Sequence, residues 1–233
     1  MLNSLELTGR ARTHVCQLDE LNAALHRDAV NPFLDMRAQA AREGIDIAVA
    51  SSFRDFDAQL RIWNKKFGGE RTLYDAQGVA LDYASLSEPQ IIDAILCWSA
   101  LPGASRHHWG SEIDVIDRAA LGPEGRYELL PQETQAGGVF YRLHQWLDAN
   151  IARFDFYRPY DVYRGGVNPE AWHLSYAPVS SQALQLMTLD VLREALATAD
   201  LHGKDRVLQQ LASIAERYVF NIAAAPVLRP PVG

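Results

Sequence analysis

The sequence predicts an α+β domain with a small central antiparallel sheet, flanking helices and extra helices towards the C-terminus. Apolar residues recur at helical spacing over residues 32–43 and then alternate with polar or small residues over 45–50. A second alternating stretch lies at 112–115, and two long helical patterns follow residue 180. Helices thus precede and follow the strands, an order that favours the α+β class.

Asn31 and Pro32 predict the start of the first helix, with asparagine as the N-cap and proline at the first helical position. Its apolar positions recur until Gly44 ends the pattern; they are Phe33, Met36, Ala40 and Ala41. The alternation over 45–50 then predicts a half-buried strand, which delivers Ser51–Arg54 at its end.

Asp55 is placed to cap a second helix, which the Gly68–Gly69 pair ends. The apolar positions of this helix are Leu60, Trp63 and Phe67. Residues 70–86 have no clear period and are expected to form a loop over one side of the functional site. Pro89 begins a short helix that runs to Trp98, and Pro102–Gly103 breaks the chain after it.

Ile113 and Val115 alternate with Glu112 and Asp114, which predicts a strand whose Asp114 carboxylate lies opposite the apolar pair. The other expected elements are a helix around Phe140, Leu143, Trp146 and Leu147, a strand over 172–176, and amphipathic helices over 181–199 and 204–222. The apolar spacing of the last two helices is typical of core packing and requires no partner.

The composition fits one globular domain over 1–233. The chain has 233 residues and a mass of 26.0 kDa, with 48% hydrophobic and 22% charged residues. A net charge of −7 argues against a nucleic-acid partner, because Lys and Arg drive binding to phosphates, and it disfavours an anionic membrane surface for the same reason. Nothing in the sequence fixes an oligomeric state.

Cys97 lies in an apolar run, which favours a buried free thiol, although a disulfide with Cys16 is also compatible with the sequence. The first ten residues lack the continuous apolar core of a signal peptide, and no apolar stretch reaches the roughly 18 residues of a membrane span. The sequence as given therefore predicts a cytoplasmic protein, or a periplasmic one if a leader has been removed.

Two separated motifs supply the parts of a catalytic zinc site. Asp114 follows His107 by seven positions, with Gly110 between them to allow a tight bend, and Glu170 precedes His173 by three. Each motif alone is weak, but together they offer two imidazoles and one carboxylate, which leaves the fourth zinc position open for water. Glu170 then remains as a general base. The alternative is that Glu170 caps a turn and His173 pairs with a strand neighbour.

Arg54 adds a group that recognises a carboxylate. If its planar fork receives the free C-terminus of a peptide, removing it costs about 1.5 to 3 kcal/mol of binding. The alternative is a surface arginine in an ordinary ion pair with Asp55 or Asp57. The other histidines lack such companions and are expected to be surface or satisfied polar residues; they are His14, His26, His144 and His202. The role of His108 stays open.

The residues resemble the VanY-type D-alanyl-D-alanine carboxypeptidases of the LAS group of zinc peptidases. The resemblance rests on Ser-Phe-Arg at 52–54 with Gln59 after it, on Ser105-x-His-x-x-Gly-x-x-x-Asp114, and on Glu170-x-Trp-His-x-x-Tyr176. It covers roughly 20–180 as a peptidase core, and leaves 181–224 as a helical extension and 225–233 as a tail.

The resemblance implies an α+β peptidase fold of the LAS and hedgehog type and hydrolysis of the bond before a terminal D-alanine in peptidoglycan stem peptides. The implied zinc ligands are His107, Asp114 and His173. Glu170 would be the base, and Arg54 would steady the scissile region or the terminal carboxylate. The implied substrate-pocket residues are Ser105, Gln59, Trp172 and Tyr176, the last two as wall and packing.

The motif around Arg54 departs from the family pattern Ser-Gly-Tyr-Arg-Ser, since Phe53 replaces the tyrosine and Asp55 adds a carboxylate. Together with the expected cytoplasmic location, this departure predicts an L,D-carboxypeptidase that acts on muropeptides during cell-wall recycling. A D,D-carboxypeptidase or D-Ala-D-Ala dipeptidase would use the same site. A non-catalytic peptide-binding module is the alternative of another class, and the presence of Glu170 argues against it.

Overall fold

A four-stranded antiparallel sheet organises the computed structural model, which describes residues 1–122 and 125–226. The strand order is β3 (Ile47–Ser51), β4 (Glu112–Asp117), β6 (His173–Tyr176) and β5 (Phe156–Tyr157). A separate hairpin pairs β1 (Val15–Leu18) with β2 (Ala23–His26). The predicted class, α+β with a small central antiparallel sheet flanked by helices, is confirmed.

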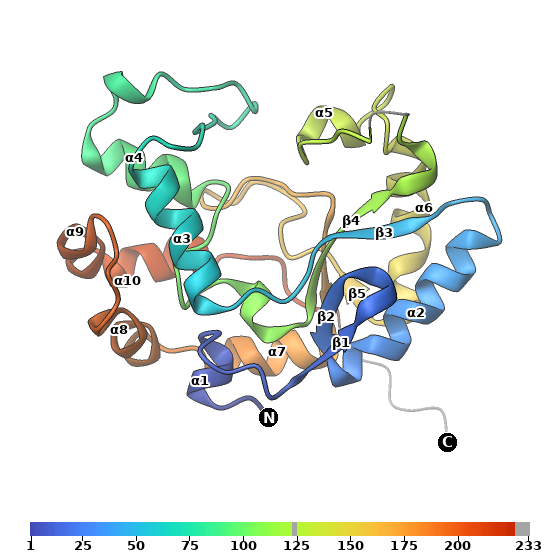
Figure 1. Ribbon diagram of the computed structural model, residues 1–233, viewed down its shortest axis with the longest axis horizontal. Helices are drawn as coiled ribbons and strands as arrows, with labels where there is room; N and C mark the ends of the chain where they lie inside the picture. Colours follow the sequence, from blue (N-terminus) through green and yellow to red (C-terminus); the bar gives the residue numbers. More distant parts are fainter. Residues whose placement is uncertain (123–124, 227–233) are drawn as a thin grey trace.

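Helices surround the sheet on both sides (Figure 1). They are α1 (Ser4–Leu7), α2 (Arg27–Ala41), α3 (Phe56–Phe67), α4 (Glu88–Leu96), α5 (Pro131–Thr134), α6 (Tyr141–Asn150), α7 (Ala177–Leu186), α8 (Leu189–Ala197), α9 (Lys204–Gln209) and α10 (Leu211–Ile214). A π-helical turn, Ala215–Val219, extends α10. In Figure 1, α2 and α6 lie together on the right, whereas α3, α4 and α8–α10 gather on the left.

The two faces of the sheet differ in polarity because side chains alternate along each strand. On one face, Ile113 and Val115 of β4 pack with Leu174 of β6 against α2 and α6, within a buried cluster that includes Phe33 and Leu143. The other face carries polar side chains. The sheet therefore forms a wall between an apolar core and a polar site.

A second core joins the C-terminal helices to α3 and α4. Leu192, Leu196 and Leu211 are buried there against Trp63 and Ile95. The expectation that these helices serve core packing is confirmed. Their attachment also brings the turn Ala215–Val219 to a cavity, which Tyr218 and Val219 line.

The predicted start of the first helix is wrong. Helix α2 begins at Arg27, and the His26 ring accepts a hydrogen bond from the Asp28 backbone N–H as its cap. Pro32 consequently lies inside the helix. Ala29 is fully buried and continues the apolar period backwards from Phe33, so burial of this face outweighs the hydrogen bond that proline removes.

The predicted helices over 181–199 and 204–222 are each divided. Thr188 separates α7 from α8, because its hydroxyl oxygen accepts from the Val191 N–H and caps a new helix. The second stretch breaks at Gln210, between α9 and α10. Residues 227–233 of the expected tail lie outside the described residues.

Cys16 is exposed and Cys97 is half-buried, and both thiols are free. The prediction of a free Cys97 thiol is thus confirmed, although the side chain is less buried than expected. Within residues 1–122 and 125–226, none of the helices combines the length and apolarity that crossing a bilayer requires.

The prediction that the histidines outside the two motifs are surface or satisfied residues is confirmed for the exposed His202 but not for His14 and His144, which are buried and each leave one ring nitrogen without a hydrogen-bond partner among the described residues. His14 Nε2 lies 2.9 Å from the His108 carbonyl oxygen, and His202 is exposed at the edge of the Phe67 ring. His144 is buried in α6, where its Nδ1 faces Arg158. Burial and the Arg158 charge lower the pKa of His144 to about 4.

His144 is expected to make stability fall as the pH drops from about 6.5 to about 4. In this window the unfolded chain binds a proton at this position that the folded protein excludes, so the free energy of unfolding decreases by up to about 1.4 kcal/mol per pH unit. Urea denaturation of His144→Gln with chelator present should show a shallower decline than wild type. His202→Gln, at an exposed histidine, is the control, and parallel declines for wild type and His144→Gln would contradict the prediction.

Candidate metal and substrate site

The register of the central sheet brings three polar residues into one row. Ser51 of β3 pairs with Asp114 of β4, and Asp114 pairs with His173 of β6. A bulge between Val49 and Ser51 inserts one extra residue into β3, which shifts Ser51 into this row. Predicted strand positions far apart in the sequence thus meet on the polar face of the sheet.

His107 reaches the row from a short 3₁₀ helix, Arg106–Trp109, that ends at Gly110. Gly110 has a φ of 67°, and a Cβ there would lie 2.8 Å from the backbone nitrogen of His26, so the bend requires glycine. The Nδ1 atom of His107 lies 2.9 Å from the Ser52 carbonyl oxygen, to which it donates. This bond leaves the Nε2 lone pair directed at Asp114, whose Oδ2 is 3.3 Å away.

His173 lies between two carboxylates. Its Nδ1 is 2.9 Å from Asp114 Oδ1, and its Nε2 is 2.9 Å from Glu112 Oε2. Burial opposes a charge on the ring, but the two carboxylates raise the pKa of His173 to about 10. Burial would likewise raise the pKa of Asp114, yet the two histidines hold it well below its usual range.

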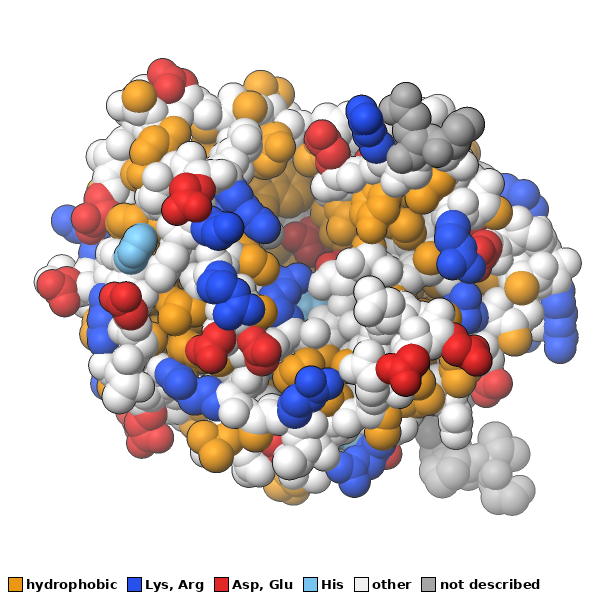
Figure 2. Space-filling model, in the orientation of Figure 1, with side chains coloured by type: hydrophobic (Ala, Val, Ile, Leu, Met, Phe, Trp, Pro, Cys, Tyr) orange, Lys and Arg blue, Asp and Glu red, His pale blue; other side chains and the backbone are white. Residues whose placement is uncertain are grey.

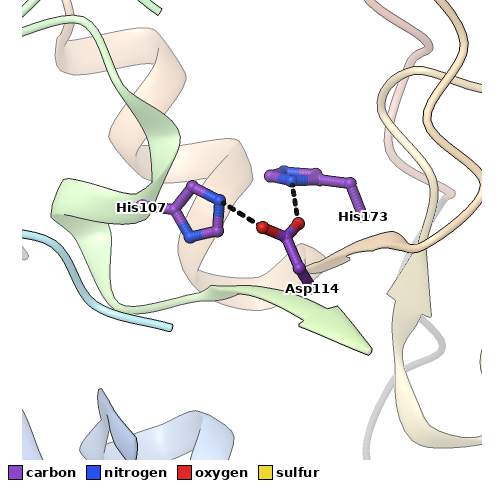
Figure 3. A group of neighbouring side chains, drawn as sticks. All are labelled: His107, Asp114 and His173. Atoms are coloured by element: carbon purple, nitrogen blue, oxygen red, sulfur yellow. Dashed lines mark hydrogen bonds and ion pairs between the residues drawn. The ribbon is translucent and has the colours of Figure 1, made fainter. Parts of the chain in front are cut away.

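The geometry of these three residues fits a metal ion. One ligand atom from each of His107, Asp114 and His173 lies within 4.8 Å of the others, and all three side chains are buried (Figure 3). In Figure 3 both imidazoles point towards the Asp114 carboxylate from different elements. Two nitrogen donors and one carboxylate form the kind of set that catalytic zinc sites use.

Glu170 stands beside this group without joining it. Its Oε2 is 3.8 Å from His173 Nδ1, longer than a hydrogen bond, and its side chain is 12% exposed. Burial is the main cause that raises the pKa of Glu170 to about 7. A carboxylate with this proton affinity is suited to take and return a proton near neutral pH.

Arg54 is held by neutral partners instead of a surface ion pair. Its Nη1 donates to Gln59 Oε1 at 2.7 Å, and its Nη2 donates to Ser51 Oγ at 2.8 Å. The Asp55 carboxylate accepts from the Ala58 N–H as the N-cap of α3. The alternative of an ordinary pair with Asp55 or Asp57 is therefore wrong, and the guanidinium presents its charge to the cavity that it lines.

A cavity of about 230 Å³ opens on the polar face of the sheet. Figure 2 shows the molecule hollowed near its middle, with basic side chains on one side and acidic ones at depth. The residues that line this cavity include the three metal-ligand candidates and also Glu170 and Arg54. Other lining residues are Lys66, Tyr74, Trp98, Ser99, Ser105, Arg106, Glu128, Tyr160, Trp172, Ile214, Tyr218 and Val219. Tyr74 belongs to the loop predicted over 70–86.

Four predicted pocket residues occupy different places. Ser105 lines the cavity, and Trp172 forms part of its wall with its ring stacked on Trp98, the centroids 6.4 Å apart. Gln59 is instead fully buried behind Arg54 and holds the guanidinium. Tyr176 has the expected packing role but does not line the cavity, because strand alternation sends its ring into the apolar cluster behind the sheet, against Phe156.

The residues that flank the key motifs face away from the cavity. His108 Nδ1 lies 2.6 Å from the Arg54 carbonyl oxygen, and its Nε2 accepts from the Gly103 N–H, so its role is to brace the loop. Phe53 contacts the His14 ring, and Asp55 caps α3. The departures around Arg54 thus lie outside the cavity and supply no argument about substrate stereochemistry.

Glu112 is a site residue that the sequence analysis missed. It is fully buried, pairs with Arg106 at 3.2 Å and accepts from Ser175 Oγ at 2.9 Å. Its other oxygen faces His173 Nε2, which leaves His173 Nδ1 for the metal side. A carboxylate that binds the far nitrogen of a ligand histidine fixes its orientation. The available signal was its place two residues before Asp114, on the same strand face.

Comparisons with known proteins agree with the sequence pattern. The family model VanY, described as D-alanyl-D-alanine carboxypeptidase, matches residues 22–179. Two uncharacterized proteins of Haemophilus influenzae match part of the chain. One is 34% identical over 122 residues, which cover 51% of this chain and 92% of that protein. The other is 44% identical over 98 residues, which cover 41% of this chain and 67% of that protein. A D-alanyl-D-alanine carboxypeptidase of Enterococcus faecalis is 29% identical over 156 residues, 65% of this chain and 48% of that protein.

Solved structures share the fold. VanYB in complex with D-Alanine-D-Alanine has a TM-score of 0.53 at 21% identity, covering 82% of this chain and 92% of that one. A mutant of the D,D-pentapeptidase VanY in complex with Zn(II) has a TM-score of 0.52 at 21% identity, covering 73% and 83%. The LdcB LD-carboxypeptidase has a TM-score of 0.50 at 18% identity, covering 83% and 82%.

Proposed function

Because the chain belongs to the VanY family of D-alanyl-D-alanine carboxypeptidases, we propose that it is a zinc carboxypeptidase that removes the C-terminal D-alanine from peptidoglycan stem peptides. The observation that carries the proposal is the convergence of the His107–Asp114–His173 group, Glu170 and Arg54 in one cavity. Metal-dependent hydrolysis beside a free carboxylate uses these three parts: a metal-ligand set, a proton acceptor and a receptor for the carboxylate.

Zinc is the metal that the donor set supports. His107 Nε2, an Asp114 oxygen and His173 Nδ1 would hold it, with Ser52 and Glu112 orienting the two rings from behind. When bound, zinc supplies a Lewis acid that polarises the scissile carbonyl and makes water more acidic. The Zn(II) complex of the VanY mutant supports the same choice.

The residues of the chain divide the remaining work. The free Arg54 donors bind the terminal carboxylate of the peptide, and Gln59 and Ser51 hold the guanidinium in place for it. Glu170 takes the proton from the attacking water as the new C–O bond forms. It then delivers this proton to the amine nitrogen as the peptide C–N bond breaks. The stacked Trp98 and Trp172 rings close one side of the cavity and exclude bulk water.

The finer proposal is L,D-carboxypeptidation of tetrapeptides released as muropeptides during wall turnover. In a tetrapeptide the residue before the scissile bond is diaminopimelate, joined through its L-centre, whereas in a pentapeptide it is D-alanine. The size of the cavity supports a long charged side chain at this position, and so does Lys66, a lining cation that, unlike Arg106, has no carboxylate partner among the described residues. A D,D-carboxypeptidase or D-Ala-D-Ala dipeptidase would share the metal site and Glu170.

Product analysis tests this function. The purified protein should release D-alanine from a defined tetrapeptide faster than from the matching pentapeptide, and a chelator should abolish the activity until zinc is restored. A faster pentapeptide reaction would indicate D,D-carboxypeptidation, and release of D-alanyl-D-alanine would indicate a dipeptidase. Peptide binding without any turnover by the zinc-loaded protein would identify a binding module.

A further inference from the structure

We infer that Lys66 and Ser99 form a subsite for a side-chain carboxylate on the residue before the scissile bond, so that the protein selects peptides with diaminopimelate over peptides with lysine. The inference rests on the proposed function and specifies the substrate class for it. Lys66 lines the same cavity as Arg54 and Glu170 but belongs to neither the metal-ligand group nor the receptor for the terminal carboxylate.

The fold directs Lys66 inwards. It lies in the last turn of α3, on the helix face that also carries Gln59 and Trp63, both fully buried, because positions i, i+4 and i+7 share a face. Lys65, one residue earlier, is exposed to solvent. The end of one helix thus offers two lysines, of which only Lys66 lines the cavity.

The ammonium group of Lys66 has unused donors. Its Nζ donates to Ser99 Oγ at 2.6 Å, and in the part of the chain that the structure describes it belongs to no ion pair. An ammonium has three donors, so two remain for a ligand. Taking an unpaired charge out of water is unfavourable, and a carboxylate from the substrate would offset this cost. Burial lowers the pKa of Lys66 to about 8, so most of it is charged at pH 7.

Three cations line the cavity; Arg106 is paired with Glu112, and the other two, Arg54 and Lys66, match two carboxylates on one peptide. Arg54 takes the terminal carboxylate of D-alanine, which every substrate of this kind shares. Diaminopimelate and lysine differ in the carboxylate at the end of the side chain, and without it lysine presents only an ammonium. Lys66 attracts the first side chain and repels the second, so discrimination arises from both effects.

Paired substrates and paired variants test the subsite. Two tetrapeptides that differ only in meso-diaminopimelate or L-lysine at the third position are compared by kcat/KM. Wild type should prefer the diaminopimelate peptide by about tenfold or more, which is the scale of one charge-assisted hydrogen bond. Lys66→Met should lower kcat/KM for this peptide by about tenfold to hundredfold and leave the lysine peptide unchanged or improved.

Lys65→Met is the matched control, since it removes the same charge from the exposed side of the helix and should preserve the preference. Lys66→Gln, which keeps a polar group at the end of the side chain, provides a second test if Lys66→Met does not fold. Thermal unfolding is measured for each protein to show that it is folded. Equal losses on both peptides would overturn the subsite and place Lys66 at the terminal carboxylate or in support of Glu170. An unchanged preference would overturn it too. If wild type cleaves neither peptide, the proposed function itself fails.

Discussion

Replacing Glu170 by glutamine is expected to lower kcat by about 10²- to 10⁴-fold while the protein keeps its zinc. Glutamine preserves the shape of the side chain but cannot accept a proton. Glu170 Oε2 lies 3.8 Å from His173 Nδ1, so the carboxylate is near the metal ligands without being required as one. The measurements are kcat on a D-alanine-terminated tetrapeptide and zinc content after dialysis.

Glu128→Gln is the matched control for this variant. Glu128 also lines the cavity with a carboxylate, but it is exposed at the rim and should tolerate the change within about threefold. Retention of most of the activity in Glu170→Gln would remove Glu170 from the proton transfer. Loss of both zinc and activity in Glu170→Gln would instead identify Glu170 as a zinc ligand, and the proposed ligand set would be wrong.

Replacing Glu112 by alanine should reduce the free energy of unfolding by about 3 to 5 kcal/mol, because it leaves the Arg106 charge buried without its partner. Arg106 is 3% exposed and Glu112 is fully buried. Despite the cost of burial, the Arg106 charge and the bonds from His173 and Ser175 lower the pKa of Glu112 to about 2. Guanidinium denaturation with chelator present measures the change without a contribution from metal binding.

A double variant separates the charge from the shape. Arg106→Met combined with Glu112→Met removes both charges, and it should recover most of the stability that Glu112→Ala loses. Asp190→Ala is the surface control: it breaks an exposed pair with Arg193 and should cost less than about 1 kcal/mol. A Glu112→Ala protein within 1 kcal/mol of wild type would show that Arg106 finds compensation elsewhere.

Local patterns predicted the elements that carry the site, but not their partners. The strand at Ile47–Ser51, the capped helix after Asp55 and the strand around Asp114 were predicted because each has its own periodicity or cap. The hairpin of β1 and β2 was missed, since β2 is buried at all four positions and shows no alternation. Strand β5 has two residues, too few for any period.

The metal-ligand candidates were found because their chemistry identifies them even without geometry. Glu112 was overlooked because its meaning depends on register, which places it opposite Ser175 and next to His173. In the sequence, Lys66 resembles an ordinary lysine at the C-terminal end of a helix, where a positive charge interacts favourably with the helix dipole. Its spacing from Gln59 and Trp63 was a usable signal for an inward side chain. Tyr176 shows the opposite case: its place in the family motif suggested a pocket residue, but its phase in the strand gives it only the packing role that was also expected.

Part of the wall of the cavity comes from a stretch of chain that supplies none of its reacting groups. The family match ends at residue 179, whereas Ile214, at the end of α10, and Tyr218 and Val219, in the π-helical turn after it, also line the cavity. Selectivity can therefore diverge while the reacting groups are conserved, because substitutions in that turn reshape the wall without touching a metal-ligand candidate, Glu170 or Arg54. Grafting the turn between relatives is a direct route to enzymes with the same reaction and new peptide preferences.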